Sequence, residues 1–217
     1  MKQYRDLFFD LDGTVINSFS GVSRSYLYAL EKMGRQVSDV SELRRVVGPP
    51  LAESLAELYG LRGKENEMAV RYYREYYLQH NAVYDFTLYD GIVDAISALR
   101  ERGYRISLAT SKPERMAKLI LDRLGIASLF DFVGGADEET GRTEKVDVIR
   151  YVLSNLKGSD VGTSLMIGDR RYDTEGASML GLDTLGVLWG FGDEAELISS
   201  GVLALASSPF DLLSLLP

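Results

Sequence analysis

Two aspartates, Asp10 and Asp12, follow a short apolar segment near the start of the chain. Residues 7–9 of this segment are apolar without alternation, a pattern typical of a strand that is covered on both faces. A polar strand end with a turn after it would explain one aspartate and Gly13. It does not explain the whole string Asp-Leu-Asp-Gly-Thr, because burying a carboxylate is costly unless the group is paired or bound to a metal. The string therefore predicts a functional site.

Further polar groups follow later predicted strands or begin later predicted helices. Because the carboxyl ends of parallel strands meet at one edge of a sheet, we expect these groups to gather beside Asp10 and Asp12. Taken singly they have ordinary explanations, as helix caps, a solvated lysine or an acid favoured by a helix dipole. Their occurrence together and in this order favours a site. They are Thr110, Ser111, Lys112, Lys145, Asp169 and Asp173.

These residue types suit phosphoryl transfer. Carboxylates about 4 Å apart repel by about 4 kcal/mol at an effective dielectric constant near 20. Mg2+ relieves such repulsion and accepts a few carboxylates, waters and a phosphate oxygen as ligands. The hydroxyls of Thr110 and Ser111, near the expected start of a helix, and the ammonium of Lys145 suit phosphate oxygens. One aspartate can attack phosphorus and form an aspartyl-phosphate, and a second can move protons.

The pattern of apolar residues predicts an α/β fold. Residues 17–85 are predicted to be helical, and helices alternate with strands from residue 86 onward. Alternation of this kind indicates a Rossmann-like parallel sheet with helices on both faces, here with an inserted four-helix cap domain. We therefore predict a core domain of residues 1–16 and 86–217 and a cap domain of residues 17–85. The predicted cap helices are 18–33, 38–47, 51–59 and 64–80. The later helices are 91–102, 113–124, 143–156, 172–180 and 209–216, and the strands are 104–109, 132–134, 163–167, 184–187 and 202–206.

The composition of the chain argues against several classes of function. The 217 residues carry a net charge of -8, with 46% hydrophobic and 26% charged residues. Nucleic acid is an unexpected partner, because its backbone is bound by basic surfaces. The absence of cysteine excludes disulfides and thiolate chemistry, and a single histidine, His80, argues against a Ser-His-Asp triad. No apolar run approaches a membrane span, so we expect a cytoplasmic protein without membrane partners.

The chain resembles the haloacid dehalogenase-like (HAD) hydrolase superfamily over nearly its whole length. The string that begins at Asp10 matches the first motif, Thr110-Ser-Lys-Pro the second, Lys145 the third, and Gly168-Asp-Arg-Arg-Tyr-Asp173 the fourth. Valine follows Lys145 where many relatives have proline, and Lys112 is the nearby alternative. The cap turn Gly-Pro-Pro-Leu at 48–51 is similar to the phosphoglycolate phosphatase-like or 5'-nucleotidase-like branch.

The resemblance implies a role for each residue of these motifs. Asp10 would be the nucleophile and Asp12 the general acid and base. Mg2+ would be held by the Asp10 side chain, the Asp12 backbone carbonyl and Asp169, with Asp173 in or just behind the metal shell. The transferring phosphoryl group would be bound by Thr110 and Lys145, and Ser111 is a further candidate for substrate contact.

The cap offers weaker candidates. Arg45, with its neighbour Arg44, is a candidate for substrate contact, although both are equally consistent with solvated helix residues. The tyrosines at 72, 73, 76 and 77 could stack on a base or sugar, but their spacing favours the core of the cap.

These observations predict a Mg2+-dependent phosphatase of small phosphorylated metabolites, of the phosphoglycolate or nucleoside monophosphate type. We expect a monomer or a weak homodimer. Two alternatives remain: a sugar phosphomutase with the same core, and a non-catalytic phosphate-binding protein. An acid at position 12 favours phosphoryl transfer over dehalogenation, because the dehalogenase members are expected to lack it.

Overall fold

The computed structural model describes residues 3–216. Its internal contacts divide the chain into two compact units. One unit comprises the chain up to Ile16 together with the part from Leu88 onward, and the other is Asn17–Thr87. The chain passes between the units at β2 (Ile16–Asn17) and β3 (Thr87–Leu88), which pair as a two-stranded sheet. Among the described residues, no helix has the length and apolarity that crossing a bilayer requires.

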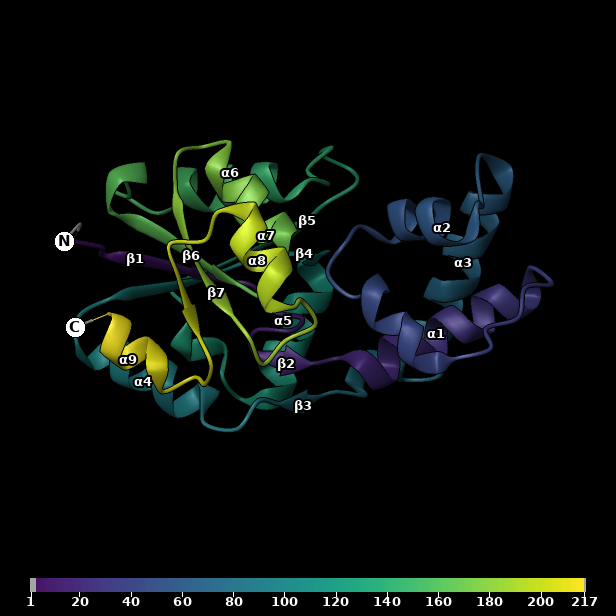
Figure 1. The fold of residues 1–217 in the computed structure, drawn as a ribbon, viewed down its shortest axis with the longest axis horizontal. Coiled ribbons are helices and arrows are strands. Elements are labelled where there is room, and N and C mark those ends of the chain that lie inside the picture. The colour runs from purple at the N-terminus through teal and green to yellow at the C-terminus, as the bar shows by residue number, and fades with distance from the viewer. Residues whose placement is uncertain (1–2, 217) are drawn as a thin grey trace. The chain divides into compact units, whose positions relative to one another are not determined.

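A six-stranded sheet forms the centre of the larger unit, and every neighbouring pair in it is parallel (Figure 1). The strand order is β5-β4-β1-β6-β7-β8, which confirms the predicted parallel α/β sheet. The strands are β1 (Asp6–Phe9), β4 (Arg105–Pro113), β5 (Phe132–Ala136), β6 (Ser164–Gly168), β7 (Asp183–Val187) and β8 (Ala204–Ala206).

The chain order of these strands places β1 at the point where ligands of such sheets bind. After β1 the chain builds β4 and β5 on one side, and then β6, β7 and β8 on the other. The order in which the strands are added therefore reverses at β1, between β4 and β6. Parallel sheets bind ligands at such a switch point, outside the carboxyl ends of the strands.

Helices cover both faces of this sheet. Figure 1 shows α6 and α7 on one face and α4 and α9 on the other. The helices of this unit are α4 (Ile92–Glu101), α5 (Glu114–Leu124), α6 (Lys145–Asn155), α7 (Arg171–Ser178), α8 (Glu194–Ser200) and α9 (Asp211–Leu215), with 3₁₀ turns η3 (Ala127–Leu129) and η4 (Val161–Thr163).

Helix α8 is the one helix of this unit that we did not predict. Only Leu197 is buried within its seven residues, so no apolar periodicity marks it. The start of α8 could nevertheless have been predicted from the residues there. Asp193 caps the helix by accepting a hydrogen bond from the backbone N–H of Glu196 at 2.8 Å. The spacing Asp-x-x-Glu is a known signature of a helix N-terminus.

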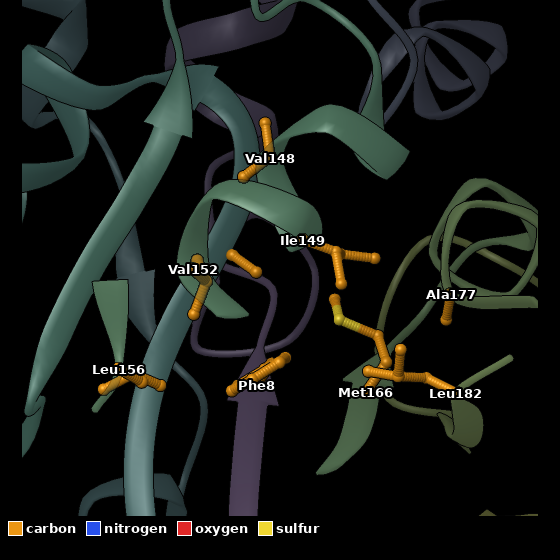
Figure 2. Close-up of a cluster of buried hydrophobic side chains, with 9 residues drawn as sticks. Phe8, Val148, Ile149, Val152, Leu156, Met166, Ala177 and Leu182 are labelled. Carbon is orange, nitrogen blue, oxygen red and sulfur yellow. The ribbon is translucent and has the colours of Figure 1, made fainter. Parts of the chain in front are cut away.

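Side chains of the three central strands form a core against α6 and α7 (Figure 2). Successive residues of a strand point to opposite faces, so Phe8 lies in this core and its neighbours in β1 face the other layer. Leu7, Phe8 and Phe9 are all fully buried, as expected for a strand covered on both faces. The core consists of Phe8, Ala109, Val148, Ile149, Val152, Leu156, Met166, Ala177 and Leu182.

The smaller unit is helical apart from its two ends, but it differs from the four-helix prediction. Its α-helices are α1 (Phe19–Lys32), α2 (Leu51–Tyr59) and α3 (Lys64–Gln79). The segment predicted as a helix at 38–47 is instead the 3₁₀ helix η1 (Val40–Val46), capped by Asp39. This segment buries only Leu43 and Val46 and soon meets Pro49 and Pro50, which discourage a longer helix. A further 3₁₀ turn, η2 (Ala82–Tyr84), follows α3.

The tyrosines of α3 pack within this unit. The ring of Tyr73 meets Tyr26 edge to face with centroids 5.1 Å apart, and Tyr77 stacks on it at 5.5 Å. Tyr26 is buried to 1% exposure, so these rings belong to the core of the unit. On the flank, Tyr76 stacks on the exposed His80 at 4.5 Å. Packing accounts for these contacts without a ligand.

Asp6 at the start of β1 is fully buried and supports the end of the sheet remote from the switch point. Its carboxylate accepts hydrogen bonds from Arg105 Nε at 2.5 Å and from Ser159 Oγ at 2.9 Å. Burial alone would raise the pKa of Asp6, but these hydrogen bonds and the charge of Arg105 outweigh it and hold the pKa below the ordinary 3.8. The carboxylate form is therefore favoured in the folded protein.

We predict that Asp6→Asn lowers the free energy of unfolding at pH 7 by about 1–3 kcal/mol, the usual range for a hydrogen bond to a charged group. The wild-type advantage exists above the unfolded-state pKa, near pH 4, and is lost as pH falls through the lower folded-state value. Urea unfolding at pH 7 and at pH 3 should therefore show a difference that shrinks in acid. The exposed Asp122→Asn is the control, and an equal difference at both pH values would contradict the prediction.

Candidate active site

A tight turn after β1 projects Asp10 and Asp12 at the switch point of the sheet. The backbone carbonyl of Leu11 accepts three hydrogen bonds from the residues that follow, which closes the turn. Gly13 has φ +91°, and a Cβ atom there would lie 2.1 Å from Oδ2 of Asp169. Only glycine allows both this backbone angle and this close approach, which explains the glycine of the motif.

Lys145 is the first residue of α6 and lies between two aspartates. Its Nζ donates to Asp10 Oδ1 at 2.7 Å and to the Ala109 carbonyl at 2.9 Å, and lies 2.7 Å from Asp173 Oδ1. The first two contacts are hydrogen bonds and the third is an ion pair. The side chain of Lys145 is 6% exposed, so its charge acts within the site and not on solvent. Lys145 therefore lies in the site although Val146 follows it where many relatives have proline.

Three buried carboxylates, Asp10, Asp169 and Asp173, offer oxygens that all lie within 4.8 Å of one another. Asp169 accepts from the backbone N–H of Phe191 at 2.7 Å, and Asp173 from that of Arg170 at 3.1 Å. One ammonium among three carboxylates leaves an excess of negative charge. Oxygen ligands in this number fit a hard divalent cation, so the residues present suit a metal ion.

The pKa values in this group reflect burial and crowding. Burial, with the nearby Asp173 carboxylate adding to it, raises the pKa of Asp10 to about 6 in spite of the opposing charge of Lys145. Burial and the charges of Asp173 and Asp10 also raise the pKa of Asp169. Burial alone would lower the pKa of Lys145, but the charges of Asp10 and Asp173 outweigh it and raise the pKa. A divalent cation would relieve the same strain on the carboxylates.

Asp12 has a different partner from the other aspartates. Nζ of Lys112 lies 3.1 and 2.9 Å from its two carboxylate oxygens, and both side chains are largely buried. The pairing register between β4 and β5 shifts between Thr110 and Pro113. Such a bulge re-aims side chains beside active sites, and here it accompanies the contact of Lys112 with Asp12. The carboxylate of Asp12 is not part of the three-carboxylate group, and a role for its backbone carbonyl in metal binding stays a prediction.

Thr110 and Ser111 lie in a strand and not at a helix start. We expected a strand at 104–109 and a helix from Pro113, but β4 continues to Pro113 and α5 begins at Glu114. Pairing with β5 through Ala136 keeps this stretch extended. Thr110 is 1% exposed, and its hydroxyl accepts from the backbone N–H of Lys112 at 3.2 Å. The hydroxyl keeps its own proton to donate, and its contact with a phosphate oxygen stays a prediction.

Arg44 and Arg45 lie exposed on η1 in the smaller unit. Their proposed contact with substrate stays a prediction, as does that of Ser111.

Several site residues were not predicted from the sequence. Lys112 was expected at the same edge of the sheet but was given no role of its own beyond that of an alternative to Lys145, although each lysine contacts a different aspartate. The segment Trp189-Gly-Phe-Gly after β7 was not examined as part of the site, yet it contacts Asp169. It could have been found by the rule applied to the other strands, because it also follows the carboxyl end of a predicted strand.

A parallel α/β sheet with a buried aspartate, a lysine and three grouped carboxylates at its switch point suits an enzyme of the phosphoryl-transfer class. Comparison with known proteins agrees with this class. Residues 7–187 match the model of the family described as haloacid dehalogenase-like hydrolase. The chain therefore belongs to the haloacid dehalogenase-like hydrolase family, as its motifs predict.

Individual relatives include proteins with different names. A 5'-nucleotidase of Pseudomonas aeruginosa is 35% identical over 195 residues, which cover 90% of this chain and 87% of that protein. The tyrosine-protein kinase PtkA of Mycobacterium tuberculosis is 37% identical over 85% of this chain, a match that spans 62% of that protein's length. The crystal structure of a predicted phosphatase from Clostridium acetobutylicum has a TM-score of 0.93 and 36% identity, covering 98% of this chain and 97% of that one.

Proposed function

We propose that this protein is a Mg2+-dependent phosphatase that hydrolyses small phosphomonoesters through an aspartyl-phosphate on Asp10. The observation that carries the proposal is the placement of Asp10 beside Lys145 and the acidic group, with Asp12 two residues away on the same turn. The family and its phosphatase-named relatives support a phosphoric monoester hydrolase. In the proposal, residues 17–87 serve as a cap that restricts which substrates react.

The first step in this mechanism is attack of an Asp10 carboxylate oxygen on phosphorus. The bond from phosphorus to the ester oxygen breaks, and the leaving oxygen takes a proton from Asp12. Lys145 stabilises negative charge on the phosphoryl oxygens, and the hydroxyl of Thr110 donates a hydrogen bond to them. Lys112, which contacts both oxygens of Asp12, would hold that side chain in place beside the Asp10 turn.

The second step releases phosphate. Asp12, now deprotonated, takes a proton from a water molecule as the water oxygen attacks phosphorus. The bond between phosphorus and Asp10 breaks, which restores the carboxylate and frees inorganic phosphate. Asp10, Asp169 and Asp173 would hold the Mg2+ ion, which when bound supplies positive charge to the phosphoryl oxygens and neutralises the carboxylates.

Metal removal tests the proposal. The purified protein should release phosphate from an aryl phosphate, and chelation should lower kcat/KM by at least about 100-fold, because a bound cation stabilises several kcal/mol of transition-state charge. Added Mg2+ should restore the activity, and Ca2+ should restore less because it prefers more ligands and longer bonds. Full activity in the presence of chelator would contradict the metal requirement.

The acceptor of the phosphoryl group separates the rival functions. A phosphatase releases inorganic phosphate into water, whereas a phosphomutase returns the phosphoryl group to a second sugar hydroxyl, and a kinase of the kind named among the relatives transfers it to tyrosine. Phosphoglycolate, nucleoside monophosphates and sugar phosphates form the substrate panel. Binding of phosphate without turnover of any member would favour the non-catalytic alternative.

A further inference from the structure

The segment after β7 contacts two parts of the site at once. The backbone N–H of Phe191 donates to Asp169 Oδ2 at 2.7 Å, and the indole Nε1 of Trp189 donates to the Thr14 carbonyl at 3.0 Å. The hydroxyl of Thr14 in turn lies 3.4 Å from Asp169 Oδ1. These contacts form a closed ring through the turn after β1, the end of β6 and the segment after β7. We call residues 189–192 the Trp189 loop.

The Trp189 loop is held against Asp169 without room for any side chain at its centre. A Cβ atom on Gly190 would lie 2.3 Å from Asp169 Cβ, 2.4 Å from its Oδ2 and 2.5 Å from the Gly13 carbonyl oxygen. Gly192 is equally close, with the Asp169 carbonyl oxygen 2.0 Å from the position of its Cβ. The loop backbone therefore touches both the buried carboxylate and the turn that carries Asp10.

The contacts of the Trp189 loop fix both the position and the orientation of the Asp169 carboxylate. Asp169 is fully buried among like charges, which on their own would turn its carboxylate away from Asp10 and Asp173. A hydrogen bond to a charged acceptor is about twice as strong as one between neutral groups. One such bond to Oδ2 and a contact to Oδ1 fix the plane of the carboxylate, and each oxygen retains lone pairs for another ligand.

We infer that the Trp189 loop is the positioning element of the site, which holds the Asp169 carboxylate and the Asp10 turn in the arrangement that binds the divalent cation. The inference rests on the proposed function, because it assigns a purpose to the metal site proposed there. Trp189 and Phe191 are positioning residues in this account and act through Thr14 and Asp169. Partners that orient a metal ligand usually change metal affinity by about 10–100-fold when they are altered.

Two substitutions test the inference through Mg2+ binding measured by calorimetry. Trp189→Phe keeps an aromatic ring but removes the indole donor, and we expect the Kd for Mg2+ to rise by about 10-fold. Gly190→Ala forces the loop away from Asp169, and we expect a rise of up to about 100-fold. The Mg2+ concentration for half-maximal activity should rise in parallel with the Kd for Mg2+.

Gly162→Ala is the matched control for Gly190→Ala. Gly162 is exposed, its φ is outside the left-handed region, and the only atom near its Cβ position is an oxygen of the Asp160 side chain. The Gly162→Ala variant should bind Mg2+ with the same Kd as wild type. A merely structural role for the Trp189 loop would lower the melting temperature of its variants without changing the Kd for Mg2+.

Fluorescence gives a second measurement that needs no folded variant of the loop. Trp189 is the only tryptophan in the sequence, so its emission reports on the loop alone. Emission should change as Mg2+ is added to wild type, with a midpoint equal to the calorimetric Kd, and Asp169→Asn should abolish the response. Wild-type Mg2+ binding with no emission change and with unchanged affinity in Trp189→Phe would overturn this inference alone. Failure of wild type to bind Mg2+ would overturn the proposed metal dependence, and this inference with it.

Discussion

Asp10→Asn is expected to lower kcat for an aryl phosphate by at least about 10⁴-fold, the scale of loss when a catalytic nucleophile is removed. An amide cannot form the acyl-phosphate bond on which the proposed mechanism depends. The change removes one of three crowded carboxylates and leaves Lys145 in contact with Asp173. Burial raises the pKa of Asp10 from the ordinary 3.8 to about 6, so ionising this carboxyl group at neutral pH costs more in the folded protein than in the unfolded chain. The variant should therefore melt at the same temperature as wild type or higher.

Activity and stability must be measured together for Asp10→Asn. The assays are initial rates with Mg2+, thermal unfolding, and acid quenching with labelled substrate to trap the phosphorylated protein. Wild type should trap label on Asp10, and the variant should trap none. Asp94→Asn, a change of the same type at an exposed position on α4, should retain wild-type rates. Turnover by Asp10→Asn within 10-fold of wild type would show that another group attacks phosphorus.

Lys145→Met should affect both activity and stability. Removing a cation that stabilises the transferring group commonly costs about 10²–10³-fold in kcat. Removing one partner of a buried ion pair also costs about 3–5 kcal/mol of stability, because the remaining charges lose their compensation. Here two carboxylates, those of Asp10 and Asp173, lose the ammonium that lies 2.7 Å from each.

The stability loss of Lys145→Met should depend on pH and on Mg2+. Without Lys145, burial and Asp173 raise the pKa of Asp10 further, so the folded state pays for ionising Asp10 as pH rises above the unfolded-state value. The deficit measured by urea unfolding should therefore be larger at pH 8 than at pH 5. Mg2+ should recover part of it, because the ion replaces the missing positive charge.

Lys118→Met is the control for Lys145→Met. Lys118 is an exposed lysine on α5 that pairs with Glu114 four residues earlier. Exposed pairs of this kind contribute at most about 1 kcal/mol, and activity should not change. A stability loss in Lys145→Met that is independent of pH and of Mg2+ would mean that packing of the lysine chain, and not its charge, supports the site.

The order and type of most elements, and the membership of much of the site, follow from the sequence. The unbroken apolar run before Asp10 indicates a doubly covered strand, and Leu7 and Phe9 are indeed buried on the face opposite Phe8. Parallel strands place their carboxyl ends at one edge, so residues at or just beyond the carboxyl ends of β1, β4 and β6 must be neighbours. This geometric rule tolerates an error in a strand end, because β4 ends at Pro113 and not at residue 109 and its polar residues still lie at the predicted edge.

Pairing within the site was decided by tertiary structure. The sequence could not say which lysine meets which aspartate, because Lys112 near the end of β4 and Lys145 at the start of α6 both lie at the same edge of the sheet. A register shift in β4 accompanies the contact of Lys112 with Asp12, while the start of α6 brings Lys145 to Asp10. Such shifts depend on pairing with β5, a segment about twenty residues away that carries no local signal of the bulge.

The turn at Asp10 shows both what the sequence determines and what only the tertiary structure decides. Its sequence alone showed that two carboxylates end a buried strand and that a glycine follows them, which predicts phosphoryl-transfer chemistry and the family. The support of that turn was decided only in three dimensions, because Trp189 and Phe191 reach Thr14 and Asp169 from more than 170 and 20 residues away, respectively. Contacts over such separations depend on the packing of the whole sheet, and residue spacing does not encode them.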